Sequence, residues 1–417
     1  MRAAAACAVA LMLTADAPRF DIAKTDVLVD DGVAIAASGF APGASITVTL
    51  RGGAGDQLTS SATFVADANG AIDLGKMAPT RGSYKGADAM GLFWSVTRKS
   101  PPQDEDAGGS SPESWTLTAE AAGAPPARAT LRRRAVAEGV RISPVRENGL
   151  VGMFYEPPDA GRHPSIIVLG GSGGGIPPAI GPAGGFASRG YAVLALAYFG
   201  APGLPRTLSN IPLEYFGTAL QWLANRPTVD PSRIAVVGSS RGAELALLLG
   251  TLFPALRAVA AYMPSNVVNR GCCDMSTPVA WTLGGRAIAP VPAAGMRGRA
   301  GMMPMDRPEI PVEHIHGGVI LISGKDDGVW ESSEMAARIE SRLRRNHFAF
   351  PVVSLVYDHA GHAITRPYTS TMDLDSRRHP ISGRMIHAGG TPSGNAHARD
   401  DSWPRVLSFL DENLRAR

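Results

Sequence analysis

Short segments in which apolar and polar residues alternate mark the first part of the chain, from about residue 20 to residue 130. Residues 46–50 (Ile-Thr-Val-Thr-Leu) alternate, and residues 61–65 and 114–119 repeat the pattern. A period of two is typical of strands that bury one face. Turn sequences such as Asp-Ala-Asn-Gly at 67–70 separate these segments. Short strands between turns predict an antiparallel β-sandwich, immunoglobulin-like in outline.

After residue 140 the apolar residues form continuous runs instead. These runs lie at 166–169, 193–196, 234–237, 258–263 and 319–323. Strands that are apolar on both faces are typical of a parallel sheet covered by helices on each side. Residues 212–224 carry leucines and a phenylalanine at helical spacing and predict one such helix. We therefore expect a β-sandwich domain over 20–134 and an α/β domain over 140–417, with the boundary at 132–139.

Composition and charge fit this organisation. A chain of 417 residues is long enough for two domains, and 45% apolar residues are sufficient for a real core. The formal net charge of +3 is small and the Lys and Arg residues are dispersed, so no nucleic-acid partner is expected. The three consecutive arginines at 132–134 lie at the predicted domain boundary, where we expect a solvated linker; a binding patch is the alternative.

The N-terminus carries a candidate export signal. Arg2 precedes an alanine-rich stretch, and Ala15-Asp16-Ala17 is a candidate cleavage site. Weak hydrophobicity and Pro18 count against a signal, so residues 1–19 predict either export to the periplasm or, if they are not cleaved, a cytoplasmic protein. No other apolar stretch approaches the roughly 20 residues that cross a bilayer, so no stable membrane insertion is expected.

The three cysteines are Cys7, Cys272 and Cys273. Adjacent cysteines close a disulfide ring only with strain, so no disulfide framework is predicted. The sequence has neither Cys-x-x-Cys nor a Cys/His cluster with metal spacing, so we expect no structural zinc, and no cofactor.

A Gly-x-Ser-x-Gly sequence carries the main chemical signal. Gly-Ser-Ser-Arg-Gly at 238–242 follows the apolar run at 234–237 and precedes a helical stretch at 243–249. At such a strand-to-helix turn the serine takes a strained backbone conformation, and flanking glycines let neighbouring chain approach. The turn raises the hydroxyl above the sheet, in front of a helix N-terminus that favours negative charge. Ser240 is therefore the candidate nucleophile.

A serine nucleophile needs a base and an acid that orients the base. In the α/β-hydrolase fold the chain order is Ser, then Asp or Glu, then His. Asp326 and Asp327 follow the last of the apolar runs above, and either carboxylate fits. His359 and His362 follow a further predicted strand at 352–357, where the base is expected. We prefer His362, which a glycine precedes, and interpret His359 as a solvent-facing loop residue.

A glycine-rich loop is the candidate oxyanion site. Gly-Gly-Ser-Gly-Gly-Gly at 170–175 directly follows the apolar run at 166–169. This loop and the residue after the nucleophile supply backbone donors in α/β-hydrolases, so the amides of Gly171, Ser172 and Arg241 are the candidates. A phosphate cradle is the alternative, but the loop lacks the Lys-Ser/Thr ending of a P-loop and the acidic residue of a dinucleotide site.

These motifs resemble one family, the acyl-CoA thioesterases and bile acid-CoA:amino acid N-acyltransferases. The matching segments are Leu-Glu-Tyr-Phe at 213–216, Gly-Ala-Glu-Leu at 242–245, Gly-Lys-Asp-Asp-Gly-Val-Trp at 324–330, Gly-Ser-Tyr at 82–84 and Met-Gly-Leu-Phe-Trp at 90–94. In the family's acid loop the second Asp serves, which favours Asp327 over Asp326. The last two segments resemble the family's N-terminal β domain, so the resemblance covers nearly the whole chain.

The resemblance implies acyl transfer from a thioester through an acyl-enzyme, with Ser240 attacking, His362 moving the proton and Asp327 holding the imidazole. The N-acyltransferases carry cysteine at the nucleophile, so serine favours water as the acceptor. The expected partner is a small-molecule acyl thioester or ester. Two alternatives stay open: a carboxylesterase of the same mechanism that acts on small esters outside the cytoplasm, and a binding protein with an inactive hydrolase fold.

A long stretch rich in Gly, Pro and Met spans residues 264–312. Long insertions beside an active site are often functional, so we interpret it as a cap over the acyl site; an ordinary surface excursion is the alternative. The compartment also bears on the substrate, because coenzyme A esters are mainly intracellular.

Overall fold

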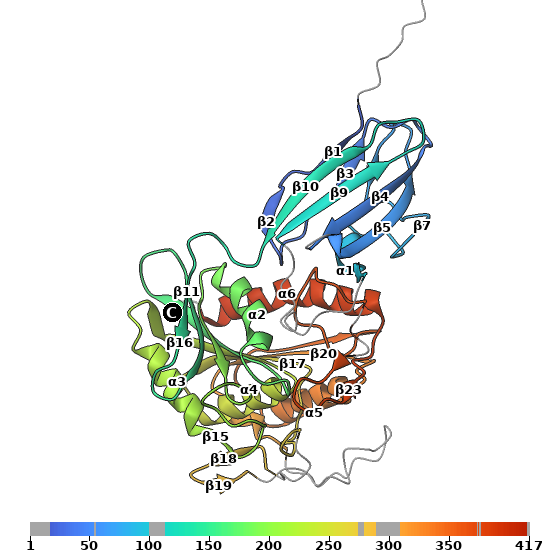
Figure 1. The fold of residues 1–417 in the computed structure, drawn as a ribbon. Coiled ribbons are helices and arrows are strands. Elements are labelled where there is room, and N and C mark those ends of the chain that lie inside the picture. The colour runs from blue at the N-terminus through green and yellow to red at the C-terminus, as the bar shows by residue number, and fades with distance from the viewer. Residues whose placement is uncertain are drawn as a thin grey trace, which may run out of the picture. The chain divides into compact units, whose positions relative to one another are not determined.

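The computed structural model describes residues 17–53, 56–99, 113–273, 279–288, 309–372, 374 and 377–414 (Figure 1). These residues form two compact units. Residues 17–25, 32–99 and 114–132 form the first, whereas 26–31 and the chain from 133 onward belong to the second. The candidate export signal lies outside the described residues except for its last three positions. Where the structure describes the chain, no helix combines the length and apolar character needed to cross a lipid bilayer.

The first unit consists of antiparallel strands (Figure 1). One sheet has the order β1 (Arg19–Asp21), β3 (Ala36–Ser38) and β6 (Ile72–Asp73). The other runs β10 (Ala127–Arg134), β9 (Ser114–Glu120), β4 (Ser45–Gly52), β5 (Leu58–Val65) and β7 (Arg81–Gly82), with β8 (Thr97–Arg98) beside β5. A short helix, α1 (Gly91–Trp94), buries its side chains.

The alternating pattern along β4 has the predicted physical cause. Ile46, Val48 and Leu50 have no exposed surface, while the residues between them reach solvent. Ile46 lies opposite Phe64 of β5, which is also fully buried. Each strand therefore contributes one apolar face to the core of this unit, as a period of two requires.

The prediction of a solvated linker at 132–134 is wrong. These residues end β10, and Arg133 is only 1% exposed. Its guanidinium donates to the carbonyl oxygens of Val29 and Tyr368, and Arg134 binds Asp26 of β2 (Asp26–Leu28), with Nε 2.7 Å from Oδ1. The acceptors lie 104 and 235 residues away from Arg133 along the chain. A local run of arginines cannot indicate such partners.

The second unit is built on one mixed sheet. Its order is β11 (Arg141–Val145), β12 (Val151–Glu156), β14 (Ala192–Ala197), β13 (His163–Leu169), β16 (Val229–Ser239), β17 (Leu256–Tyr262), β20 (Gly318–Gly324) and β21 (Val352–Tyr357). The pairs β11–β12 and β12–β14 are antiparallel, and every later neighbour pair is parallel. The predicted apolar runs all fall on these strands, apart from Met263 just beyond β17.

Helices cover both faces of this sheet (Figure 1). The helices α3 (Glu214–Ala224), α4 (Arg241–Leu252) and α5 (Ser332–Arg345) pack in one core, and α2 (Pro177–Ala187) and α6 (Pro392–Leu414) pack in the other. Successive residues of β13 alternate between the two cores: Ile167 and Leu169 join the first, Ile166 and Val168 the second. Since both faces are buried, the strand is apolar throughout.

One predicted boundary differs from the structure. The helix expected over 212–224 begins at Glu214, because Ile211–Pro212 forms a short strand, β15, beside β18 (Trp281–Leu283). That pairing is non-local, so helical spacing alone could not reveal it. The remaining short elements are β19 (Arg286–Ala287), η4 (Val312–His314), β22 (Arg377–Arg378) and β23 (Met385–Ile386).

This strand order, with one antiparallel end and helices on both faces, is that of the α/β-hydrolase fold. The sequence predicts an α/β-hydrolase preceded by an immunoglobulin-like β-sandwich; the α/β-hydrolase fold and a β-rich N-terminal region are confirmed. Ser240 follows β16, Asp327 follows β20 and His362 follows β21. The carboxyl ends of parallel strands share one edge of the sheet, so residues far apart in sequence meet there.

Candidate active site

Ser240 occupies a sharp turn between β16 and α4. Its backbone angles are φ 56° and ψ −120°, a left-handed conformation that a residue with a side chain rarely adopts. The turn is possible because its neighbours are glycines. A Cβ on Gly238 would lie 2.0 Å from the oxygen of Gly242, and one on Gly242 would lie 2.4 Å from the oxygen of Gly170. These are backbone atoms that no side-chain rotation can move.

His362 and Asp327 lie in line with this serine. The Nε2 atom of His362 is 2.8 Å from Ser240 Oγ, and its Nδ1 is 2.8 and 2.9 Å from the two carboxylate oxygens of Asp327. The Asp327 side chain is 1% exposed and that of His362 is 12% exposed. Because a carboxylate can only accept, we assign the Nδ1 proton to that bond, which leaves Nε2 free to accept from the serine.

The Asp327 carboxylate is itself held by backbone donors. Asp327 Oδ1 accepts hydrogen bonds from the amides of Val329 and Trp330, at 2.9 and 3.2 Å. The Trp330 ring packs edge-on against the His362 imidazole, with ring centroids 5.2 Å apart. The alternative pair, Asp326 and His359, lies outside this arrangement. Their side chains are 51% and 75% exposed and contact each other at 3.4 Å.

The glycine-rich loop lies directly beside Ser240. A Cβ added to Gly171 would lie 3.1 Å from Ser240 Cβ and 3.5 Å from its Oγ. The loop is fixed from behind by Tyr198, whose hydroxyl donates to the Gly170 oxygen at 2.6 Å. Burial raises the pKa of Tyr198, so the hydroxyl keeps its proton. On the other side of the serine, Arg241 is the first residue of α4, where a backbone amide has no carbonyl of a preceding helical turn to donate to.

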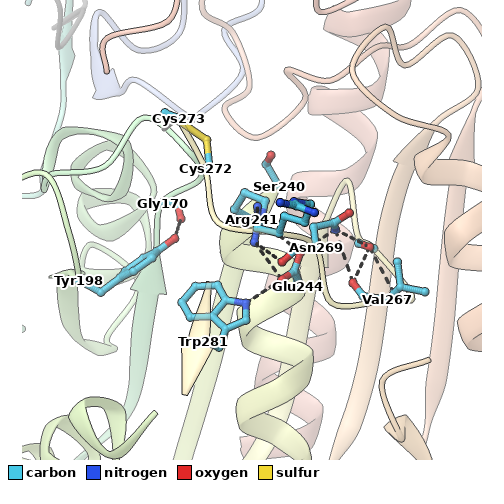
Figure 2. Close-up of polar contacts among 12 residues, drawn as sticks. Gly170, Tyr198, Ser240, Arg241, Glu244, Val267, Asn269, Cys272, Cys273 and Trp281 are labelled. Carbon is cyan, nitrogen blue, oxygen red and sulfur yellow. Dashed lines mark hydrogen bonds and ion pairs between the residues drawn. A yellow bond between two sulfur atoms is a disulfide. The ribbon is translucent and has the colours of Figure 1, made fainter. Parts of the chain in front are cut away.

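The side chain of Arg241 points away from the serine hydroxyl, into a buried polar network (Figure 2). Its guanidinium is 3.1 Å from Glu244 Oε2, and it donates to the carbonyl oxygens of Arg270 and Asn269 at 2.7 and 3.2 Å. Glu244 is fully buried and also accepts from Trp281 Nε1 and Asn269 Nδ2, both at 2.7 Å. The Arg241 charge beside Ser240 is thus paired with a buried carboxylate. Sequence reasoning did not predict this network, because a Glu in a first helical turn usually faces solvent.

A second histidine, which sequence reasoning also missed, contacts the glycine-rich loop. His379 Nδ1 accepts from the amides of Ile381 and Ser382 at 3.3 and 3.1 Å, so its Nε2 carries the proton. That nitrogen donates to Ser172 Oγ at 3.0 Å. Burial lowers the pKa of His379 below its usual 6.5, partly offset by hydrogen bonding to Ser172. The surrounding sequence contains no motif that would have indicated this residue.

The cysteine pair also departs from expectation. Cys272 and Cys273 are joined by a disulfide (Figure 2), although no disulfide framework was predicted. Their sulfur atoms and a ring nitrogen of His379 lie within 4.8 Å of one another, a Cys/His cluster that sequence spacing did not predict. The disulfide belongs to the stretch expected to form a cap at 264–312. Residues 274–278 and 289–308 of that stretch lie outside the described residues.

Comparison with known proteins places this chain in a family. The model described as "Acyl-CoA thioester hydrolase/BAAT N-terminal region" matches residues 30–147, and "BAAT / Acyl-CoA thioester hydrolase C terminal" matches 211–416. Acyl-coenzyme A thioesterase 6 of Mus musculus is 29% identical over 416 residues, and acyl-coenzyme A thioesterase 1 of Rattus norvegicus is 29% identical over 408. Each alignment covers 92% of this chain and 94% of the relative.

A solved structure with a similar fold is a putative dienelactone hydrolase from Klebsiella pneumoniae. It is 16% identical, with a TM-score of 0.45, over 66% of this chain and 98% of that one. The N-terminal model matches most of the first unit, and the C-terminal model matches the second unit from residue 211 onward, in the order in which the family has them. The chain therefore belongs to the acyl-CoA thioester hydrolase/BAAT family.

Proposed function

We propose that this protein hydrolyses acyl-CoA thioesters through an acyl-enzyme on Ser240. One observation carries the proposal: Ser240 Oγ, the His362 ring and the Asp327 carboxylate form one hydrogen-bonded line with contacts of 2.8 to 2.9 Å. It is supported by membership of a thioester hydrolase family. Curated relatives that are named acyl-coenzyme A thioesterases align with this chain over nearly their whole length.

In the first half-reaction, Ser240 attacks the thioester carbonyl carbon while His362 Nε2 takes the hydroxyl proton. Asp327 stabilises the imidazolium and fixes its orientation. The developing oxyanion is bound by the backbone amides of Arg241 and of Gly171 or Ser172. The carbon–sulfur bond then breaks, and coenzyme A leaves as a thiol with the proton that His362 returns.

In the second half-reaction a water molecule attacks the acyl-serine ester. His362 now takes a proton from water and returns it to Ser240 as the acid departs. The N-acyltransferases that this chain resembles carry cysteine as nucleophile, so the serine supports water rather than an amino acid as acceptor. The products are a free acid and coenzyme A.

A second candidate function is a carboxylesterase of the same mechanism that acts outside the cytoplasm. The Cys272–Cys273 disulfide favours it, since disulfides persist mainly in oxidising compartments. Under this alternative, residues 1–19 direct export to the periplasm. N-terminal sequencing of the protein from its native host, together with the assay below, separates the two functions.

The test compares substrates and variants. Specificity constants for acyl-CoA esters of several chain lengths are measured beside those for p-nitrophenyl esters. We expect the acyl-CoA series to contain the best substrate; values far below those for simple esters throughout that series would overturn the thioesterase proposal. A fluorophosphonate probe should label the wild-type protein and a Ser408→Ala control, whose serine is exposed on α6, but not Ser240→Ala. Labelling that survives in folded Ser240→Ala would remove this serine from the mechanism.

A further inference from the structure

The chain segment that leads to the disulfide is anchored to the nucleophile turn (Figure 2). The Arg241 guanidinium donates to the carbonyl oxygens of Asn269 and Arg270, and the Asn269 side chain donates to Glu244 at 2.7 Å. Arg241 is 6% exposed and Glu244 is fully buried. The segment is therefore held in place as far as Arg270 by groups that solvent barely reaches.

The disulfide itself packs against the glycine-rich loop. Cys273 Sγ lies 3.8 Å from the Ser172 oxygen and 3.8 Å from His379 Nε2. The amide of Cys272 donates to the Leu208 oxygen at 2.9 Å. His379 in turn binds Ser172 Oγ, so Ser172 is held from two directions. A change at the disulfide would reach the loop through direct contact.

The backbone at Cys273 is in a conformation that needs support. Its φ of +88° lies in the left-handed region, where residues with a side chain are rare. Such conformations persist where surrounding structure imposes them. The covalent link to Cys272 is one such constraint. Opening it frees the residue to return to an ordinary conformation, which would move the sulfur away from Ser172.

We propose that the Cys272–Cys273 disulfide is a thiol-exchange site that controls turnover. The inference rests on the proposed function, in which the carbon–sulfur bond of the substrate breaks at Ser240 and coenzyme A leaves as a free thiol. The disulfide contacts the glycine-rich loop at Ser172. The preceding residue of that loop, Gly171, lies beside Ser240. Both cysteines are only partly buried, unlike the Arg241–Glu244 pair, so a small thiol can approach them.

The proposed reaction consists of two thiol–disulfide exchange steps. A coenzyme A thiolate attacks one sulfur, the Cys272–Cys273 bond breaks, and the other cysteine leaves as a thiolate and takes a proton. The product is a mixed disulfide between coenzyme A and the protein. A second thiol attacks this bond, which releases a small-molecule disulfide and leaves both cysteines as thiols. Overall the protein disulfide is reduced by two electrons and two thiols are oxidised.

Intact-protein mass spectrometry tests the exchange without relying on catalysis. Full-length protein is incubated with coenzyme A, and separately with glutathione at the same concentration. We expect a mixed disulfide or a gain of two hydrogens in wild-type protein, and neither change in Cys272→Ser/Cys273→Ser. Faster reaction with coenzyme A identifies it as the partner, and equal rates assign the site to small thiols generally. No exchange with either thiol overturns the proposal.

Turnover of a p-nitrophenyl ester, which releases no thiol, then tests the consequence. Loss of one oxyanion donor typically lowers kcat by about 10²–10³-fold. In the reduced protein the loop is displaced but its donors are still present, so we expect kcat to fall by only roughly 10-fold relative to the oxidised protein, with KM little changed. Reoxidation of the reduced wild type should restore kcat. The double variant Cys272→Ser/Cys273→Ser should have the kcat of the reduced wild type, and added thiols should not change it. Equal kcat values for the oxidised and the reduced wild type would overturn the proposal that the disulfide controls turnover. Failure of acyl-CoA hydrolysis alone would instead count against the proposed function, since neither readout uses that substrate.

Discussion

Replacing Glu244 by Gln should destabilise the second unit strongly. The carboxylate is fully buried and lies 3.1 Å from the guanidinium of Arg241, a residue that is itself only 6% exposed. The substitution preserves shape but removes the negative charge, so Arg241 keeps a buried charge without a counter-ion. Glutamine also offers one acceptor oxygen where Trp281 and Asn269 both donate, so one of these N–H groups loses its partner.

The expected loss follows from these two effects. Removing one partner of a buried ion pair costs about 3–5 kcal/mol. The unpaired donor is part of the same network, so its cost of about 1–3 kcal/mol is not simply additive. We therefore expect the free energy of unfolding to fall by about 3–5 kcal/mol in total. Urea denaturation, followed by tryptophan fluorescence and circular dichroism together, measures this quantity.

A matched control is available on α5. Glu340 pairs with Arg344 at 2.7 Å, but the arginine side chain is 71% exposed. Glu340→Gln removes the same charge from a solvated pair and should cost no more than about 0.5 kcal/mol. A loss below about 1 kcal/mol for Glu244→Gln, similar to that of the control, would refute the view that this network clamps the segment to α4.

Three further predictions concern the candidate site. Asp327→Asn should lower kcat by roughly 10³–10⁴-fold in steady-state assays with the fold intact, because the amide cannot hold the His362 tautomer; a loss under about 10-fold would remove the acid role. Gly238→Ala should prevent normal folding, since its Cβ would lie 2.0 Å from the Gly242 oxygen; a melting curve equal to wild type would contradict this. His379 has a lowered pKa in the folded protein, so the unfolded chain binds more protons, and the free energy of unfolding should fall as pH drops from about 6.5 toward that lower value. His379→Gln should lack this fall when urea midpoints are compared at about pH 7.5 and pH 5; an unchanged pH dependence would contradict the shift.

The parts of this molecule that local sequence determines were predictable. The strands of the second unit are apolar throughout because both faces are buried, and the Gly-Ser-Ser-Arg-Gly turn lies between a strand and a helix whose patterns are unambiguous. The positions of Asp327 and His362 after later strands followed from the order of elements along the chain. Their catalytic roles stay predictions that the variants above will test.

Most of the features that sequence reasoning missed depend on distant partners. Pro212 belongs to a short strand only because Ile211 pairs with Trp281, and Arg133 is buried only because it finds carbonyl groups at Val29 and Tyr368. Glu244 and His379 are similar cases, since each acquires its role from contacts across 25 to 207 residues of chain. The disulfide joins adjacent residues, but its contact with Ser172 spans 101 residues of chain. Periodicity and spacing carry no information about such contacts.

The orientation of Arg241 has a consequence for how substrate structure should appear in kinetics. Its amide is a candidate oxyanion donor, while its guanidinium binds the carbonyls of Asn269 and Arg270. One residue thus joins the chemistry to a segment some 28 positions later in the chain. An acyl group that contacts and displaces the segment at Asn269 and Arg270 would also displace the Arg241 amide. We expect chain-length preference to be expressed in kcat more than in KM, because remote binding energy is then used at the reacting centre.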